Sequence, residues 1–337
     1  MLRDLRFARL VSVIVVAALG ATSAEGSARA QSRPPAGAER ASAGEPAPAA
    51  EPEERPSRAA PEAERPGRHC AGEPVAKWVG DQLLAVQTNP LGLETVVRAG
   101  ACIPLFRMPG VLFEQTQLQV GVSTFLSPAY AHVGGYVQLT PLSLLQLRAE
   151  LTGIGMWVFP SDRGAYFALD SYDADYRDEV LTSEVGESAT GWNLNLTAIL
   201  RLRVPVGPIA LIAVDSFGME RWSVGDGSHF VLLRHDVASA QSDWIAVNDA
   251  LLLAEIPLSD SIALRVGAFD ALRWVPEAGY VRNLVGGIAT LVLARPTGAI
   301  FELQPLVRAG IYTHHAFRES ELSIVVGATA AYDFGRI

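Results

Sequence analysis

The sequence predicts an all-β fold: an antiparallel up-and-down transmembrane β-barrel of about ten strands over residues 109–337. Three observations predict it. Long segments alternate apolar and polar residues, their connections alternate between short and long, and tryptophans stand where segments meet the long connections. The segments match the roughly 9–11 residues that a tilted strand needs to cross a bilayer, and exceed the usual length of strands in soluble sheets.

The alternation has a period of two and is clearest in the segment 190–204. There Leu194 and Leu196 share one face, whereas Asn195 and Arg203 share the other. Segments of this kind are predicted near residues 111–125, 130–140, 142–157, 190–204, 208–222, 244–256, 260–274, 281–294, 299–313 and 320–334.

The connections form a second regular pattern. Tight turns alternate with longer connections, as is typical of membrane barrels, which have short turns on one side and long loops on the other. An even number of strands then places both chain ends on the side of the short turns. The short turns are predicted at Thr140-Pro141, Pro205–Pro208, Pro257–Asp260 and Arg295–Gly298, and the long connections include 158–189 and 223–243.

Tryptophan placement is the third observation. Indole rings prefer the boundary between membrane and water, whereas a soluble sheet would hold them in its core. We therefore expect an aromatic girdle, joined at the same level by Phe125, Tyr130, Tyr280 and Tyr312. The tryptophans of this girdle are Trp157, Trp192, Trp222, Trp244 and Trp274.

The N-terminal part has the pattern of an exported protein. Residues 1–30 predict a signal peptide, because arginines precede the short apolar run 10–19 and small residues stand at Ala28 and Ala30. Residues 31–67 consist almost entirely of Pro, Ala, Glu, Arg, Ser and Gly. Such a composition buries too little apolar surface to fold, so it predicts a disordered linker.

Residues 68–108 are predicted to form a helical periplasmic cap. Val75, Val79 and Leu83 have helical spacing, and a second short helix is expected over 91–99. The unit would cover one barrel mouth, or alternatively enter the lumen as a plug. In an oxidising exported compartment the pair Cys70 and Cys102 predicts one disulfide that staples this unit.

Charged residues on the polar faces of the strands predict a lumen network. Charges of both signs would pair across a narrow interior, because unpaired buried charge is costly. The network either forms a filled polar core that keeps the barrel closed, or it lines a narrow pore. Its members are Arg148, Glu150, Arg201, Arg203, Glu255, Arg265, Glu302 and Arg308.

The pattern over residues 110–337 resembles bacterial outer-membrane β-barrel proteins, without indicating a subfamily. The last strand resembles their C-terminal assembly signal, with Tyr332 and Phe334 on one face, although three residues follow Phe334. The resemblance implies a location in the Gram-negative outer membrane with both termini in the periplasm. It also implies contact with outer-membrane lipid and lipopolysaccharide, and recognition by the barrel assembly machinery.

The predicted function is a structural barrel or a narrow, porin-like passive channel. The alternative is a cell-surface binding or adhesion protein that acts through the loops 158–189 and 223–243. A rim hydrolase is less favoured. Asp173 and Asp175 supply an Asp-x-Asp pair, but Arg234-His235-Asp236 has the wrong order for its Asp-x-His partner.

No catalytic, cofactor or metal site is predicted, so we do not expect an enzyme. The chain has no G-x-S-x-G, P-loop or dinucleotide-binding fingerprint. The acidic 158–189 loop lacks the spacing of an EF-hand. The formal net charge of −9 argues against nucleic acid as a partner.

Overall fold

The computed structural model describes residues 70, 75–105, 112–113, 115–157, 164–177, 180–181, 186–297 and 299–337. The predicted signal peptide and linker lie outside these residues. Within the described ranges, no helix has the length and apolar character needed to cross a membrane.

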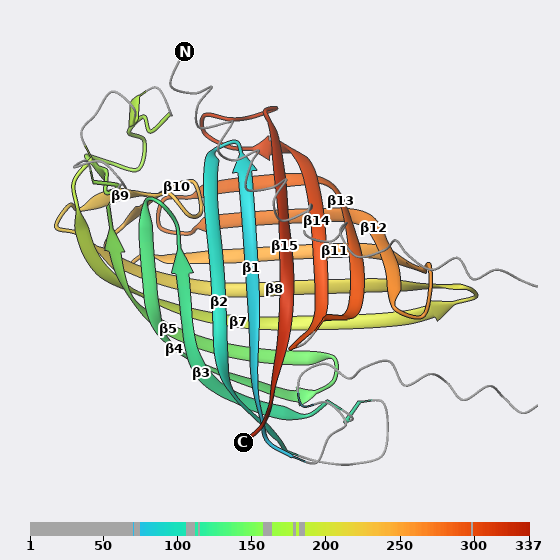
Figure 1. The fold of residues 1–337 in the computed structure, drawn as a ribbon. Helices are drawn as coiled ribbons and strands as arrows, with labels where there is room; N and C mark the ends of the chain where they lie inside the picture. Colours follow the sequence, from blue (N-terminus) through green and yellow to red (C-terminus); the bar gives the residue numbers. More distant parts are fainter. Residues whose placement is uncertain are drawn as a thin grey trace, which may run out of the picture. The chain divides into compact units, whose positions relative to one another are not determined.

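Twelve antiparallel strands form a closed barrel (Figure 1). They are β1 (Lys77–Thr88), β2 (Leu91–Pro104), β3 (Gln117–Leu126), β4 (Tyr130–Leu142), β5 (Leu145–Met156), β7 (Ala189–Val206), β8 (Ile209–Val224), β11 (Trp244–Pro257), β12 (Ile262–Val275), β13 (Tyr280–Thr297), β14 (Ile300–His314) and β15 (Leu322–Arg336). A separate three-stranded sheet contains β6 (Ala168–Leu169), β9 (His229–Leu232) and β10 (Val237–Ala240).

The barrel has two unlike ends. Short turns join β4 to β5, β7 to β8, β11 to β12 and β13 to β14 at one end, which we call the turn end. The long connections after β5 and β8 lie at the opposite end, which we call the loop end. Both ends of the barrel chain lie at the turn end, because Lys77 of β1 pairs with Arg336 of β15.

The predicted strand count and the helical cap are corrected by the structure. All ten predicted segments overlap a barrel strand, but the barrel has twelve strands and begins at Lys77. The described part of the predicted cap forms β1 and β2 instead of helices. The physical reason is closure: β15 would otherwise expose an unpaired edge, and β1 pairs with it along nearly its whole length.

The predicted disulfide is confirmed. Cys70 is bonded to Cys102, with their Cα atoms 6.0 Å apart. Cys102 lies on β2 and packs with Val79 of β1 in a small buried cluster inside the barrel. The bridge therefore fastens the segment before β1 to the barrel wall.

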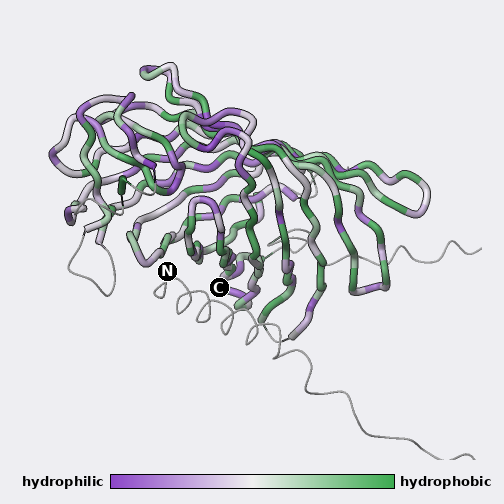
Figure 2. The backbone as a smooth tube through the Cα atoms, turned by 90° about the horizontal axis from the view of Figure 1, so that it is seen from above, coloured by the Kyte–Doolittle hydropathy of each residue, from purple (hydrophilic) through white to green (hydrophobic). Residues whose placement is uncertain are grey.

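Hydrophobic and hydrophilic residues alternate along much of the barrel wall (Figure 2), and exposure shows that most of the apolar side chains on these strands face outward. On the outer face Leu151, Leu202 and Leu252 are 58%, 59% and 61% exposed. On the inner face Glu150 and Asn193 are buried. This arrangement is the inverse of a soluble protein, in which large exposed apolar surfaces are rare.

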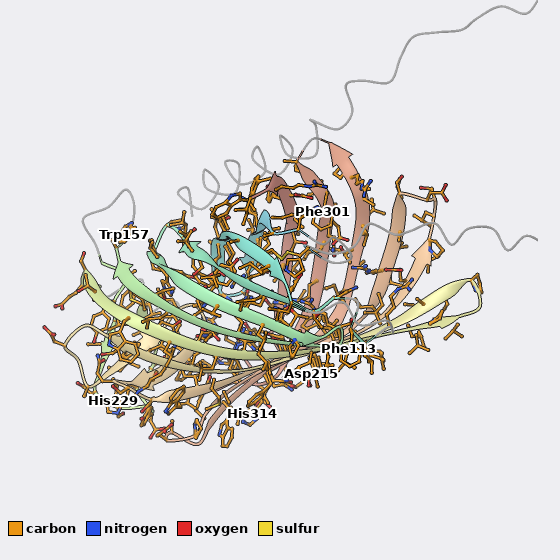
Figure 3. The ribbon with its side chains drawn as sticks, turned by 90° about the horizontal axis from the view of Figure 1, so that it is seen from below. Phe113, Trp157, Asp215, His229, Phe301 and His314 are labelled. Carbon is orange, nitrogen blue, oxygen red and sulfur yellow. A yellow bond between two sulfur atoms is a disulfide. The ribbon has the colours of Figure 1, made fainter. Side chains whose placement is uncertain are left out.

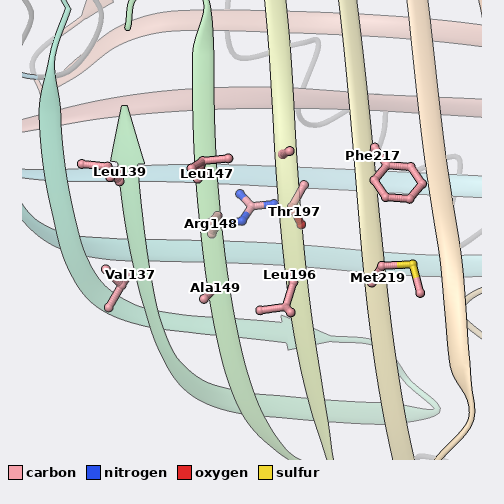
Figure 4. Close-up of a pocket in the computed structure, with 10 residues that line it drawn as sticks. Val137, Leu139, Leu147, Arg148, Ala149, Leu196, Thr197, Phe217 and Met219 are labelled. Carbon is pink, nitrogen blue, oxygen red and sulfur yellow. The ribbon is translucent and has the colours of Figure 1, made fainter. Parts of the chain in front are cut away.

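Part of the apolar outer wall is hollowed. A shallow groove of about 470 Å³ crosses β4, β5, β7 and β8 (Figure 4). Its lining includes Val137, Leu147, Leu196, Phe217 and Met219.

Polar residues interrupt the apolar outer wall of β8 to β13, among them Asp215, Asn248, Asp270 and Asn283. The strand register places Asp215 and Asp270 on either side of Ala250, all on the outward face. The Asn248 Nδ2 donates to Asp215 Oδ1 at 2.6 Å. Asp215 is labelled on β8 in Figure 3.

Candidate functional site

The loop end of the lumen is filled by the connection between β8 and β11. Its β9–β10 hairpin carries Phe230, Leu232 and Val237, which are at most 1% exposed. These side chains form one core with wall residues such as Trp222 and Ile245. The hairpin therefore belongs to the barrel interior. This position does not favour the predicted surface-binding role of the 223–243 loop.

Three consecutive residues in the hairpin turn dock it onto different parts of the barrel, and the first is Arg234. Its Nε lies 3.3 Å from Glu94 Oε2 of β2. Its guanidinium also stacks 4.2 Å above the Phe125 ring of β3. Burial acts to lower the pKa of Arg234, but Glu94 and Glu220 outweigh it and raise that pKa above its ordinary value. The docked guanidinium therefore stays charged.

His235 docks onto β8 through Glu220. The His235 Nε2 lies 2.9 Å from Glu220 Oε2, and both side chains are buried. Arg273 Nε donates to His235 Nδ1 at 3.3 Å, so Nε2 is the nitrogen that carries the proton of a neutral imidazole. Burial lowers the pKa of His235 from 6.5 and outweighs the opposing effect of Glu220.

Glu220 accepts hydrogen bonds from several side chains in this part of the lumen. Besides His235, Trp222 Nε1 donates to its Oε2 at 3.0 Å and Asn195 Nδ2 donates to its Oε1 at 3.1 Å. These hydrogen bonds satisfy a carboxylate that is only 3% exposed.

Asp236 docks onto the connection between β14 and β15. His315 Nε2 and Arg318 Nε each lie 3.0 Å from Asp236 Oδ2. Burial acts to raise the pKa of Asp236, but the hydrogen bond from His315 and the charge of Arg318 outweigh it and hold that pKa below 3.8. All three groups are buried, so the ion pair is weakly screened by salt.

Acid should release the hairpin. The pKa of His235 is lower when docked than when free, so the free hairpin binds more protons as the pH falls through 6.5. A protonated His235 that stayed docked would place its positive charge beside Arg234 and Arg273. Protonation of Asp236 weakens the docking further, but only below about pH 3.8, because the pKa of its carboxyl group lies below that value. If the lumen conducts ions, its conductance should rise as the pH falls from about 8 to about 5. His235→Gln, which does not titrate, should remove this rise; an unchanged pH dependence in that variant would contradict the assignment.

The described part of the 158–189 loop covers the hairpin. Ala168 and Leu169 pair with β9, Tyr172 Oη donates to Asp243 Oδ2 at 2.7 Å, and Tyr176 Oη donates to Tyr280 Oη at 2.9 Å. Within this part of the chain, Asp175 is paired with Arg177. Among the residues that the structure describes, no group of three or more His, Cys, Asp or Glu side chains is placed to hold a metal ion.

The predicted lumen charges face inward and fall into two groups. Glu150 lies 3.4 Å from Arg98 and 4.0 Å from Arg148. Nearer the turn end, Glu255 pairs with Arg203 at 2.9 Å and with Arg265 at 2.8 Å.

Glu302 is connected to the second group through an amide. Gln304 Nε2 donates to Glu302 Oε1 at 2.5 Å and Gln304 Oε1 accepts from Arg265 at 3.3 Å. Arg201 and Arg308 also lie on inward faces of their strands, by the register of β7 and β14.

Several interior charges were missing from the sequence prediction. Glu94 and Arg98 were assigned to a helix, which hid their positions on β2. Glu220, Asp249 and Arg273 lie on predicted strands, and their place in the alternation would have assigned them to the lumen.

The aromatic girdle is partly corrected. Trp157, Trp192 and Trp274 are 41%, 38% and 45% exposed. Trp244 pairs with the outward Arg221. Trp222 is 0% exposed and faces inward, because it shares the inner face of β8 with Glu220.

Three other aromatic residues expected at this boundary are also buried: Phe125, Tyr130 and Tyr312. A further tryptophan, Trp78, is 49% exposed at the turn end. It lies within the segment 68–108 that was predicted to be helical.

The fold and its walls define a class: a closed antiparallel β-barrel with an apolar outside and a charged inside. The chain is similar to the translocator domain of the autotransporter NalP from Neisseria meningitidis, with 11% identity, coverage of 77% of this chain and 88% of that chain, and a TM-score of 0.39. It is similar to the beta domain of the Bordetella autotransporter BrkA, with 11% identity, 77% and 100% coverage, and a TM-score of 0.40.

A third similar structure is an outer-membrane channel from Pseudomonas putida F1, with 11% identity, 79% and 99% coverage, and a TM-score of 0.40. No protein-family model matches the sequence, and no curated protein matches it. The function of this chain is therefore derived from its own residues.

Proposed function

We propose that this chain is an integral outer-membrane β-barrel that acts as a narrow passive channel, closed at its loop end by the docked β9–β10 hairpin. The observation that carries the proposal is the inverted wall, apolar outside and charged inside, on a barrel without free edges. A closed barrel satisfies every wall strand's backbone groups internally, which hydrocarbon requires.

The turn end faces the periplasm in this proposal. Short turns on the periplasmic side and long loops outside are typical of such barrels, and both barrel termini then lie in the periplasm. Tyr332 and Phe334 of β15 lie on the outer wall with their rings stacked at 5.6 Å. They are available there to the assembly machinery, and the outer wall is available to lipid and lipopolysaccharide.

Two measurements test the proposal. The folded protein should resist extraction from membranes by alkaline carbonate and should migrate faster on a detergent gel before boiling than after it. Reconstituted into planar bilayers, it should give brief, small current steps, because the hairpin is docked most of the time. Extraction by buffer alone would reject the membrane location.

A purely structural barrel is the second candidate function. The specific observation in its favour is the continuous apolar core formed by the hairpin and the wall at the loop end. If the barrel gave no current steps in planar bilayers after the hairpin had been removed, this candidate would be favoured over the channel.

A further inference from the structure

The charges that line the lumen are not evenly balanced. Every lumen-facing carboxylate on the described strands lies beside a basic side chain or accepts from an amide. These carboxylates are Asp81, Glu94, Glu150, Glu220, Asp249, Glu255, Glu302 and Asp333. Two arginines on neighbouring strands, Arg282 of β13 and Arg308 of β14, form no ion pair with any described carboxylate.

Arg308 is the less engaged of the two. It lies on the inward face of β14, near the middle of the strand. Its guanidinium stacks 4.7 Å above the ring of Phe269, and its buried Nε has no hydrogen-bond partner among the described residues. A guanidinium that stacks by its face keeps its N–H edge free, and that edge matches the two oxygens of a carboxylate or phosphate.

Arg282 repeats this arrangement nearer the loop end. It stacks 5.2 Å from the Tyr312 ring centroid, and its Nη2 donates to Tyr312 Oη at 3.2 Å. The side chain is 6% exposed, and its Nε lacks a hydrogen-bond partner within the described part of the chain. A buried donor that is left unpaired is destabilising, and a bound acceptor would remove that cost.

The neighbourhood of these two arginines is positive. Arg273 lies directly opposite Arg282 on the adjacent strand. Arg308 interacts electrostatically with Arg273, Arg282 and Asp249. Asp249 is the nearby wall carboxylate, and it is already paired with Arg273 at 3.1 Å. Asp236 of the hairpin interacts electrostatically with Arg282, but it is already paired with Arg318 at 3.0 Å. The β12–β14 side of the lumen therefore has more positive than negative charge.

We propose that this wall is an anion-binding surface, in which Arg282 and Arg308 hold small oxyanions that carry a carboxylate or phosphate group. For the passage of such anions through the lumen, the inference rests on the proposed channel function. Binding itself requires only the two guanidiniums, their aromatic supports and the excess positive charge. The chemical class of solute that the barrel prefers is then a small anion.

Calorimetric titration of the detergent-folded full chain with inorganic phosphate, at constant ionic strength, tests binding without conduction. We expect saturable binding that weakens at least tenfold in the Arg282→Gln/Arg308→Gln double variant. Arg203→Gln is the matched control, because Arg203 lies on β7 and is paired with Glu255. No saturable binding, or equal affinity in the double variant, would overturn the proposal.

A second variant separates recognition from charge or folding. Arg308→Lys keeps the positive charge but loses the planar fork, so most of the phosphate affinity should be lost while heat-modifiable migration persists. Reversal potentials in a chloride gradient then address passage: anion preference is expected, and it should fall in the double variant. A conducting barrel with no phosphate binding refutes the anion site alone, whereas binding without current refutes the channel alone.

Discussion

Excising the docked hairpin should raise the single-channel conductance several-fold. The change replaces residues 229–240 with Asn-Gly. Its ends already lie together, because Gln241 N donates to Ser228 O at 3.1 Å, and Asn-Gly is the preferred two-residue hairpin turn. Strands β8 and β11 pair directly below the excision, so the wall remains closed.

The expected increase follows from what the hairpin occupies. Phe230, Leu232 and Val237 fill the loop end, and Arg234 reaches across to β2. Removing them leaves Glu94 and Glu220 lining an open mouth. Carboxylates in an open mouth are solvated by water, so the wall tolerates their exposure better than it would tolerate burial without partners.

A graded series strengthens this experiment. Glu220→Gln retains the shape of the side chain but weakens the hydrogen bond from His235, so its conductance should fall between wild type and excision. Glu319→Gln, on the exposed part of the connection after β14, is the control and should behave as wild type. If the excised barrel conducted no more than wild type, the lumen would be closed elsewhere and the structural role would stand.

The clearest of the ten predicted strands were located because one face is apolar, as Leu194 and Leu196 show on β7. β1 and β2 were not predicted as strands because each of their faces mixes apolar and polar residues. On β1, Gly80 and Gln82 share the outer face with Leu84, whereas Val79 lies inside. Apolar residues on both faces also satisfy a helical spacing, so the period alone did not decide between helix and strand.

The hairpin was missed for a different reason. A long connection in a barrel is expected outside, yet residues 230–233 form an uninterrupted apolar run that solvent would not favour. This run was a usable signal. The alternation along β8 was another signal. It places Trp222 on the same face as Glu220 and on the opposite face from Phe217, and therefore in the lumen. The docking partners in the wall depend on strand order and register, which the local pattern does not contain.

Replacing Asp270 with leucine should stabilise the barrel in lipid, which is unusual for a single substitution. Asp270 lies on the outward face of β12 between Ala250 and Val285, and no hydrogen bond or ion pair holds it among the described residues. A carboxylate on the lipid face is destabilising, and an apolar side chain should raise the unfolding free energy by about 2 kcal/mol.

Urea-driven unfolding from lipid vesicles measures this change. Asp215→Leu should stabilise less, because it leaves the Asn248 amide without the acceptor that it now contacts at 2.6 Å. Asp260→Leu, in the exposed turn between β11 and β12, lies outside the apolar band and should be nearly neutral. If Asp270→Leu were destabilising while Asp260→Leu stayed neutral, the outer wall of β12 would be in contact with something other than hydrocarbon, and the membrane-facing assignment of that wall would fail.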